Sequence, residues 1–117
     1  MAGYRDLIVW QRSMELVEEI YRVVKILPRE ENYALADQMR RAAVSIPSNV
    51  AEGHGRESVN EFTRFIMIAQ GSRAELETQL EICKRLGYLS PAQTEKAIAL
   101  CSEVGKMLFN LYHSIKN

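Results

Sequence analysis

Apolar residues recur in alternating steps of three and four along almost the whole chain, and no stretch alternates with a period of two. This spacing places apolar side chains on one stripe of a helix that packs nearly parallel to its neighbours. Pro28, Gly53, Gly55 and Gly87 interrupt the pattern. The sequence therefore predicts four helices with short connections, which favours an all-α, antiparallel up-down-up-down four-helix bundle formed by residues 1–117 as a single domain.

The first helix is predicted over residues 6–27, because Pro28 stops it. A second apolar line, at Val9, Leu16 and Val23, runs beside the stripe expected to face the core. This second line is either part of a wide core-facing stripe or an exposed subunit interface. Ile66 and Met67 lie in the same way outside the expected core stripe of the third helix. The core stripe of the first helix is expected to consist of Leu7, Trp10, Met14, Val17, Tyr21 and Val24.

The second helix is expected to begin near Asn32 or Tyr33 and to continue through Pro47 with a kink, because the apolar pattern persists beyond the proline. Ser58 is followed three residues later by a glutamate, which predicts a capping box at the start of the long third helix. A second capping box begins at Ser90, and Gly87 is expected to provide the left-handed residue that ends the third helix.

Four polar residues on the second helix share one helical stripe: Arg41, Ser45, Asn49 and Glu52 follow one another at intervals of four, four and three. A polar stripe beside an apolar one is unfavourable unless partners satisfy it. Ser45 is expected to face Gly71 across a hairpin formed by the second and third helices. Asn49 is expected to complete the hydrogen bonding of this polar stripe.

Two opposite-charge pairs fit one register of that hairpin, because their residue numbers have the same total. The pairs are Arg41 with Glu75 and Glu52 with Arg64. One hypothesis is that both pairs are partly buried, in which case breaking one costs about 3 to 5 kcal/mol. The other is that all four side chains lie on solvated helix faces, as many charges on amphipathic helices do.

Composition limits the classes of protein to which the chain can belong. A chain of 117 residues that is 47% hydrophobic can fill a core without disulfides or structural metal. Cys83 and Cys101 lack the close spacing of zinc or redox sites and are expected to be buried, reduced thiols. We expect no membrane span and a cytoplasmic location, since charged residues interrupt every apolar run.

The sequence contains no recognisable catalytic, cofactor-binding or metal-binding set. His54 and His113 lie far apart, and the Glu-x-x-His pairs of di-iron bundles are absent from the sequence. The glycines at Gly53 and Gly55 fit neither the phosphate-loop nor the dinucleotide pattern. We therefore expect no enzyme activity, no cofactor and no metal.

Local basic clusters are the remaining candidates for ligand binding. The chain has 15 basic and 15 acidic residues, so its net charge does not indicate a dedicated nucleic-acid binder. Phosphate binding needs several cations on one surface, and a symmetric oligomer would repeat each cluster. The expected nucleic-acid contacts are Arg40, Arg56, Lys84 and Arg85.

Several segments of the chain resemble the 23S rRNA intervening-sequence proteins, also called four-helix-bundle or S23-type ribosomal proteins. The segment QMRRAAVSIPSNVAEG at 38–53 resembles the family signature, and LIVWQ at 7–11 resembles its opening. The segments EFTRF at 61–65 and AQGSRAEL at 69–76 resemble two blocks of its third helix. These matches occur in the expected order over nearly the whole chain.

The resemblance implies a four-helix bundle that often assembles as a ring of five, related to the accessory proteins of diversity-generating retroelements. Those relatives use a basic barrel to engage nucleic acid and a reverse transcriptase, whereas this chain has no basic excess. We expect a non-enzymatic homo-oligomer, with a pentamer favoured, that binds RNA or a ribonucleoprotein partner. The alternative is a protein-protein interaction scaffold without nucleic-acid contact.

Overall fold

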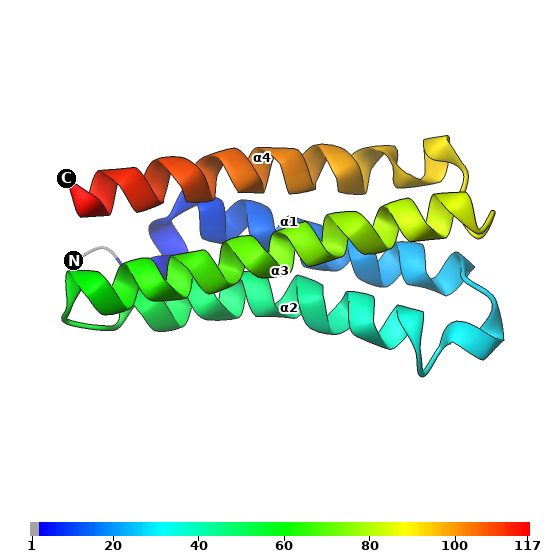
Figure 1. Ribbon diagram of the computed structural model, residues 1–117, viewed down its shortest axis with the longest axis horizontal. Helices are drawn as coiled ribbons and strands as arrows, with labels where there is room; N and C mark the ends of the chain where they lie inside the picture. Colours follow the sequence, from blue (N-terminus) through cyan, green and yellow to red (C-terminus); the bar gives the residue numbers. More distant parts are fainter. Residues whose placement is uncertain (1–2) are drawn as a thin grey trace.

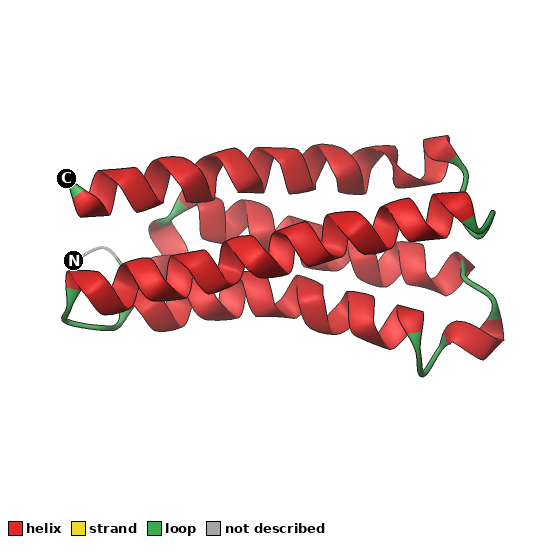
Figure 2. Cartoon of the chain, viewed as in Figure 1, coloured by secondary structure: helices red, strands yellow, loops and turns green. Residues whose placement is uncertain are grey.

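Four long helices run along the 43 Å axis of the molecule in the computed structural model, which describes residues 3–117 (Figure 1). Short 3-10 segments flank α1, and the described residues contain no strand (Figure 2). The helices are α1 (Ile8–Val23), α2 (Leu35–His54), α3 (Val59–Arg85) and α4 (Pro91–Lys116), and the 3-10 segments are Tyr4–Asp6, Val24–Ile26 and Arg29–Glu31.

The four helices surround one core. α2 packs against α1 and α3, and α4 packs against α3 and α1, so each helix touches the helices that precede or follow it around the bundle. The turn between α2 and α3 lies at one end, and the other two connections lie at the opposite end (Figure 1). The predicted antiparallel four-helix bundle is confirmed.

The buried face of α1 differs from the prediction. Met14 and Tyr21, expected in the core, are 39% and 44% exposed. Val24 is buried, and Trp10 and Val17 are partly buried against the core, so the buried stripe is wide and includes part of the predicted one. The line at Val9, Leu16 and Val23 is buried, so the alternative of a wide core-facing stripe is confirmed and this line is not an exposed subunit interface. Ser13 and Glu19 are buried beside it. The buried apolar residues of α1 are Val9, Leu16, Ile20 and Val23.

The helix ends largely follow the predicted signals. Ser58 caps α3 by accepting a hydrogen bond from the Glu61 backbone at 3.3 Å, and Ser90 begins a complete capping box on α4. Gly87 has a φ of 76°, as expected for a glycine that ends a helix. α2 begins at Leu35, slightly later than predicted, and it is continuous through the buried Pro47.

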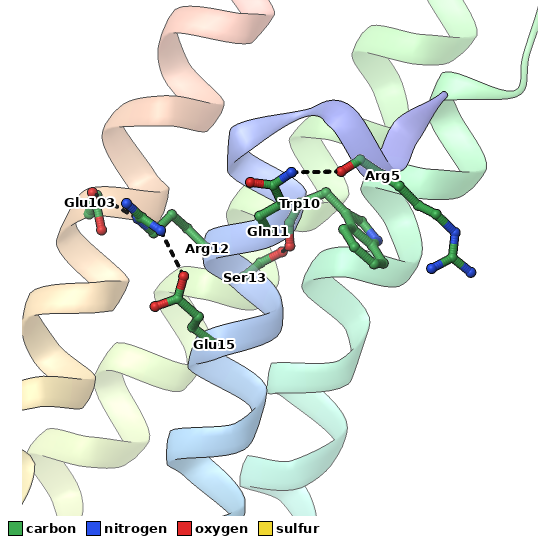
Figure 3. A network of polar contacts seen from close by, with 7 residues as sticks. All are labelled: Arg5, Trp10, Gln11, Arg12, Ser13, Glu15 and Glu103. Carbon is green, nitrogen blue, oxygen red and sulfur yellow. Dashed lines mark hydrogen bonds and ion pairs between the residues drawn. The ribbon is translucent and has the colours of Figure 1, made fainter. Parts of the chain in front are cut away.

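An ion-pair network joins α1 to α4 (Figure 3). Arg12 lies 2.7 Å from Glu15 on its own helix and 3.3 Å from Glu103 on α4. Hydrogen bonding to Glu15 is the main reason that the pKa of Arg12 is raised. The Gln11 side chain donates to the backbone carbonyl of Arg5 at 2.9 Å, which ties the N-terminal 3-10 segment to α1.

No helix among residues 3–117 combines the length and the apolar character that crossing a bilayer requires.

Candidate functional site

The predicted ion pair between Arg41 and Glu75 does not form. The Arg41 Nε donates to Asp37 Oδ2 at 3.1 Å on its own helix, and the Arg41 side chain is 79% exposed. Glu75 instead accepts a hydrogen bond from the Gln79 amide at 3.3 Å. A partner one turn away on the same helix satisfies each charge, so this prediction is wrong.

The second predicted pair, Glu52 with Arg64, is wrong for the same reason. Glu52 lies 2.8 Å from Arg56, four residues along the chain. The Arg64 guanidinium lies over the Phe65 ring, 4.9 Å from its centroid. All four charged members of the two pairs are exposed, as the alternative of solvated helix faces required.

The uncharged members of the polar stripe do join α2 to α3. The hydroxyl oxygens of Ser45 and Ser72 lie 2.8 Å apart, and Asn49 donates to the Ser45 carbonyl at 2.7 Å and to its hydroxyl at 2.9 Å. Ser45 therefore bonds to Ser72 rather than facing Gly71, one residue away from the predicted register. A small polar network replaces the predicted charged one.

At Gly53, α2 lies too close to α3 to leave room for a side chain. A Cβ added there would lie 2.6 Å from the Phe65 Cβ and 3.1 Å from a ring carbon of Phe62. Gly53 therefore serves helix packing in addition to lying near the end of α2.

Each basic residue predicted to contact nucleic acid lies beside a carboxylate. Lys84 and Arg85 lie 3.4 Å and 3.1 Å from Glu81, and hydrogen bonding to Arg85 is the main cause of the lowered pKa of Glu81. Arg40 lies 3.9 Å from Asp37.

These predicted contacts also lie at two ends of the bundle. Arg56 lies in the turn between α2 and α3, 2.8 Å from Glu52 (Figure 1). Lys84 and Arg85 end α3 at the opposite end. The structure therefore does not gather the four predicted residues into one surface of the chain.

A continuous groove runs between α3 and α4. It consists of three adjoining hollows, the largest about 500 Å³, which share Gln70, Arg73 and Phe109 on one side and Met67 and Tyr112 on the other. From Asn60 to Glu77 on α3 the groove extends for roughly 26 Å, at a rise of about 1.5 Å per residue. The other lining residues are Thr63, Arg64, Ile66, Gly71, Ala74, Ser102, Gly105, Lys106, Leu108, Asn110, His113 and Lys116.

The groove is positively charged although the whole chain is neutral. Its lining contains the cations Arg64, Arg73, Lys106 and Lys116 and one carboxylate, Glu77, which leaves a formal charge of +3. Arg73 lies 3.3 Å from Glu77. Within residues 3–117 the other three cations form no ion pair.

Aromatic side chains line the same groove. Phe109 is 59% exposed, and its ring centroid lies 4.3 Å from that of His113. Tyr112 lies against the other edge of the His113 ring, with centroids 5.3 Å apart. Cations beside exposed aromatic rings can bind the phosphates and the bases of a single-stranded nucleic acid.

Sequence reasoning missed this site, although a signal for it exists. On α4 the groove residues Lys106, Phe109, Asn110, His113 and Lys116 recur at helical spacing. They form a basic and aromatic stripe beside the core stripe. Adjacent basic residues at positions 40–41 and 84–85 are a more conspicuous signal in the sequence than cations spaced along one helix face.

The opposite side of the bundle carries an apolar hollow of about 350 Å³ between α1 and α2. Met14 and Val44, on its lining, are 39% and 40% exposed. The hollow has no charged residue in its lining. The lining residues are Tyr4, Trp10, Met14, Val17, Val44, Pro47, Ser48 and Ala51.

Both cysteines are buried free thiols. Burial raises the pKa of the Cys83 thiol to about 11 and that of the Cys101 thiol to about 12. The Cys83 thiol donates to the Met39 sulfur at 3.7 Å. No group of histidine, cysteine and carboxylate side chains among residues 3–117 could hold a metal ion.

Comparisons with known proteins agree with the architecture. The model of the 23S rRNA-intervening sequence protein family matches residues 5–110. A crystal structure of a protein of unknown function from the S23 ribosomal protein family of Bacteroides thetaiotaomicron is similar, with a TM-score of 0.83 and 26% sequence identity. That match covers 91% of this chain and 96% of the other. No curated protein matches the chain.

Proposed function

Since the chain belongs to the 23S rRNA-intervening sequence protein family, we propose that it is a non-enzymatic, homo-oligomeric protein that binds single-stranded RNA. The α3–α4 groove is the surface that we assign to the RNA. The observation that carries the proposal is the groove's formal charge of +3 in a chain of zero net charge.

The chemistry of the groove fits a polyanion with planar bases. Arg64, Lys106 and Lys116 are the cations available for phosphate oxygens, while the exposed Phe109 offers a ring for base stacking beside the partly buried Tyr112. Stacking on an aromatic ring contributes about 1 to 3 kcal/mol per base and tolerates any base sequence. This combination favours RNA over the alternative of a protein scaffold without nucleic-acid contact.

The apolar face between α1 and α2 supports the homo-oligomeric part of the proposal. Contiguous exposed apolar patches commonly mark protein contacts, and a second copy can cover this hollow without leaving a charge of its lining buried. A pentamer is the proposed state, because the resemblance to ring-forming relatives implies it. Fivefold repetition would also place five α3–α4 grooves on one particle.

Fluorescence anisotropy with a labelled uridine RNA of about eight nucleotides tests the proposed RNA binding. If the three unpaired groove cations each neutralise one phosphate, the logarithm of the binding constant falls with that of the salt concentration with a slope of about −2, and a fourth phosphate contact, at Arg73, makes the slope about −3. Replacing Lys106 and Lys116 with glutamine should reduce that slope by about 1.4.

Lys84→Gln with Arg85→Gln is the matched control, because it removes the same number of cations from residues already paired with Glu81. This control should leave the slope near that of the wild type. Absence of RNA binding at 50 mM salt, or an affinity independent of salt, would disprove the proposed function.

A further inference from the structure

The α3–α4 groove contains two glycines in the interior of helices, where glycine is less favourable than alanine. Gly105 on α4 has a packing reason within the chain: an added Cβ would lie 3.0 Å from the Arg73 Nε and 3.2 Å from its Cζ. A glycine at this position therefore lets the Arg73 guanidinium lie against the backbone of α4.

Gly71 on α3 has no comparable reason. It is exposed, and nothing lies within 4 Å of a Cβ added there. It lines the largest hollow of the groove, which Arg73 also lines. Glycine in a regular element can permit close approach of a ligand to the backbone, and at Gly71 the space that a Cβ would occupy opens into the groove.

The side chains around Gly71 hold one cation in a fixed position. The Gln70 amide donates to the Gly105 carbonyl at 3.0 Å, and its oxygen accepts from the Arg73 Nε at 2.9 Å. A further hydrogen bond joins Arg73 to Glu77 at 3.3 Å, and the Arg73 side chain is only 19% exposed. A guanidinium held in this way loses little conformational entropy when it binds a phosphate.

We propose that the sugar-phosphate backbone of the bound RNA crosses α3 at Gly71, in direct contact with the helix main chain, and that Arg73 takes the adjacent phosphate. This inference rests on the proposed function and adds the place of contact. It makes Gly71 a residue that determines what can lie in the groove, because any side chain there would hold the strand away from α3.

The test is the Gly71→Ala variant of the full chain, which changes no charge. Since alanine is the better helix former, the variant should have a melting temperature about 4 °C higher than the wild type. Its affinity for the uridine RNA should nevertheless fall at least fivefold, with an unchanged salt slope. Arg73→Gln should also weaken binding, and it should reduce the slope by about 0.7.

Ala92→Ser is the control, since it adds one heavy atom to an exposed helix position at the far end of α4. It should leave RNA affinity unchanged. If wild-type RNA binding is present and Gly71→Ala binds as tightly as the wild type, the inference is overturned while the proposed function stands. A loss of affinity that accompanies a lower particle mass also overturns it, because Gly71 would then serve a subunit contact. If the wild type does not bind the RNA, the proposed function itself fails.

Discussion

The two sides of the bundle differ in charge although both carry exposed apolar groups. The hollow between α1 and α2 is lined by eight residues without one charge, whereas the α3–α4 groove carries a formal charge of +3. Exposed apolar residues alone therefore do not distinguish a protein contact from a nucleic-acid contact on this molecule. The distinction lies in the lining: the groove contains four cations and one carboxylate, and the α1–α2 hollow contains no charge.

This comparison also explains why the overall charge is uninformative. Carboxylates along α1, α2 and the distal part of α3 neutralise neighbouring arginines and lysines, as at Arg12, Arg41 and Arg85. The balance of 15 basic and 15 acidic residues is thus unevenly distributed over the surface. The zero net charge is therefore the sum of a groove at +3 and a remainder whose formal charge is −3.

The largest expected effect concerns the apolar side. Met14→Glu with Val44→Glu should dissociate the proposed oligomer, because it places two charges per chain in the apolar contact. Light scattering should show a fall from about 67 kDa, five chains of 13.4 kDa, to the mass of one chain. Affinity for a long RNA should fall about a hundredfold through lost multivalency, while affinity for a short RNA stays unchanged.

Ile68→Glu with Ile82→Glu is the control for this change. These residues have similar exposures of 41% and 39% and line neither the hollow nor the groove. The control should retain the mass of the wild-type particle. A wild-type mass of 13.4 kDa at micromolar concentration would contradict the assignment of the apolar side to self-association.

A smaller effect is expected from the groove aromatics. Phe109→Ala should weaken binding of the short RNA about tenfold, consistent with the loss of one stacked base. The slope with salt and the particle mass should not change, because no charge and no apolar contact of the α1–α2 side is altered. Tyr33→Ala is the control, because it removes an aromatic ring that lies outside the groove and is 92% exposed. An equal loss of affinity in both variants would remove the special role of the groove.

The smallest effects on RNA affinity and on particle mass are expected from two changes in α2. Gly53→Ala should destabilise the fold by about 1 to 3 kcal/mol through overpacking against Phe65, and Arg41→Ala should shift the melting temperature by less than about 2 °C. Urea unfolding and thermal melts measure both. If Arg41→Ala destabilises the fold as much as Gly53→Ala, the exposed position of Arg41 is wrong. Neither variant should change particle mass or RNA affinity while folded.

The sequence predicted the number and order of the helices because their ends carry strong local signals, such as Ser90 and Gly87. It showed both apolar lines of α1 but not which of them is buried more deeply, because Ser13 and Glu19 interrupt the apolar pattern of the buried line. Ser13 is tolerated there since its hydroxyl donates to the Trp10 carbonyl at 2.9 Å, and the Glu19 carboxylate bonds to Arg22. Apolar spacing alone cannot detect polar residues satisfied in this way.

The candidate site was less predictable than the fold. Charges on α2 and α3 pair with residues three or four positions away, so the predicted partners of Arg41 and Glu52 across the hairpin were not needed. The groove depends on which sides of α3 and α4 face each other, and adjacency in sequence does not encode this. Arg64, predicted as half of an ion pair, instead lies in the groove.

The raised pKa values of Cys83 and Cys101, about 11 and 12, have a practical consequence. A thiol reacts as its thiolate, so at pH 8 the two native cysteines are nearly inert toward alkylating dyes. A cysteine introduced at the exposed Asn110 would be the single reactive one. A fluorophore or spin label could then be attached beside the groove without removing either native cysteine.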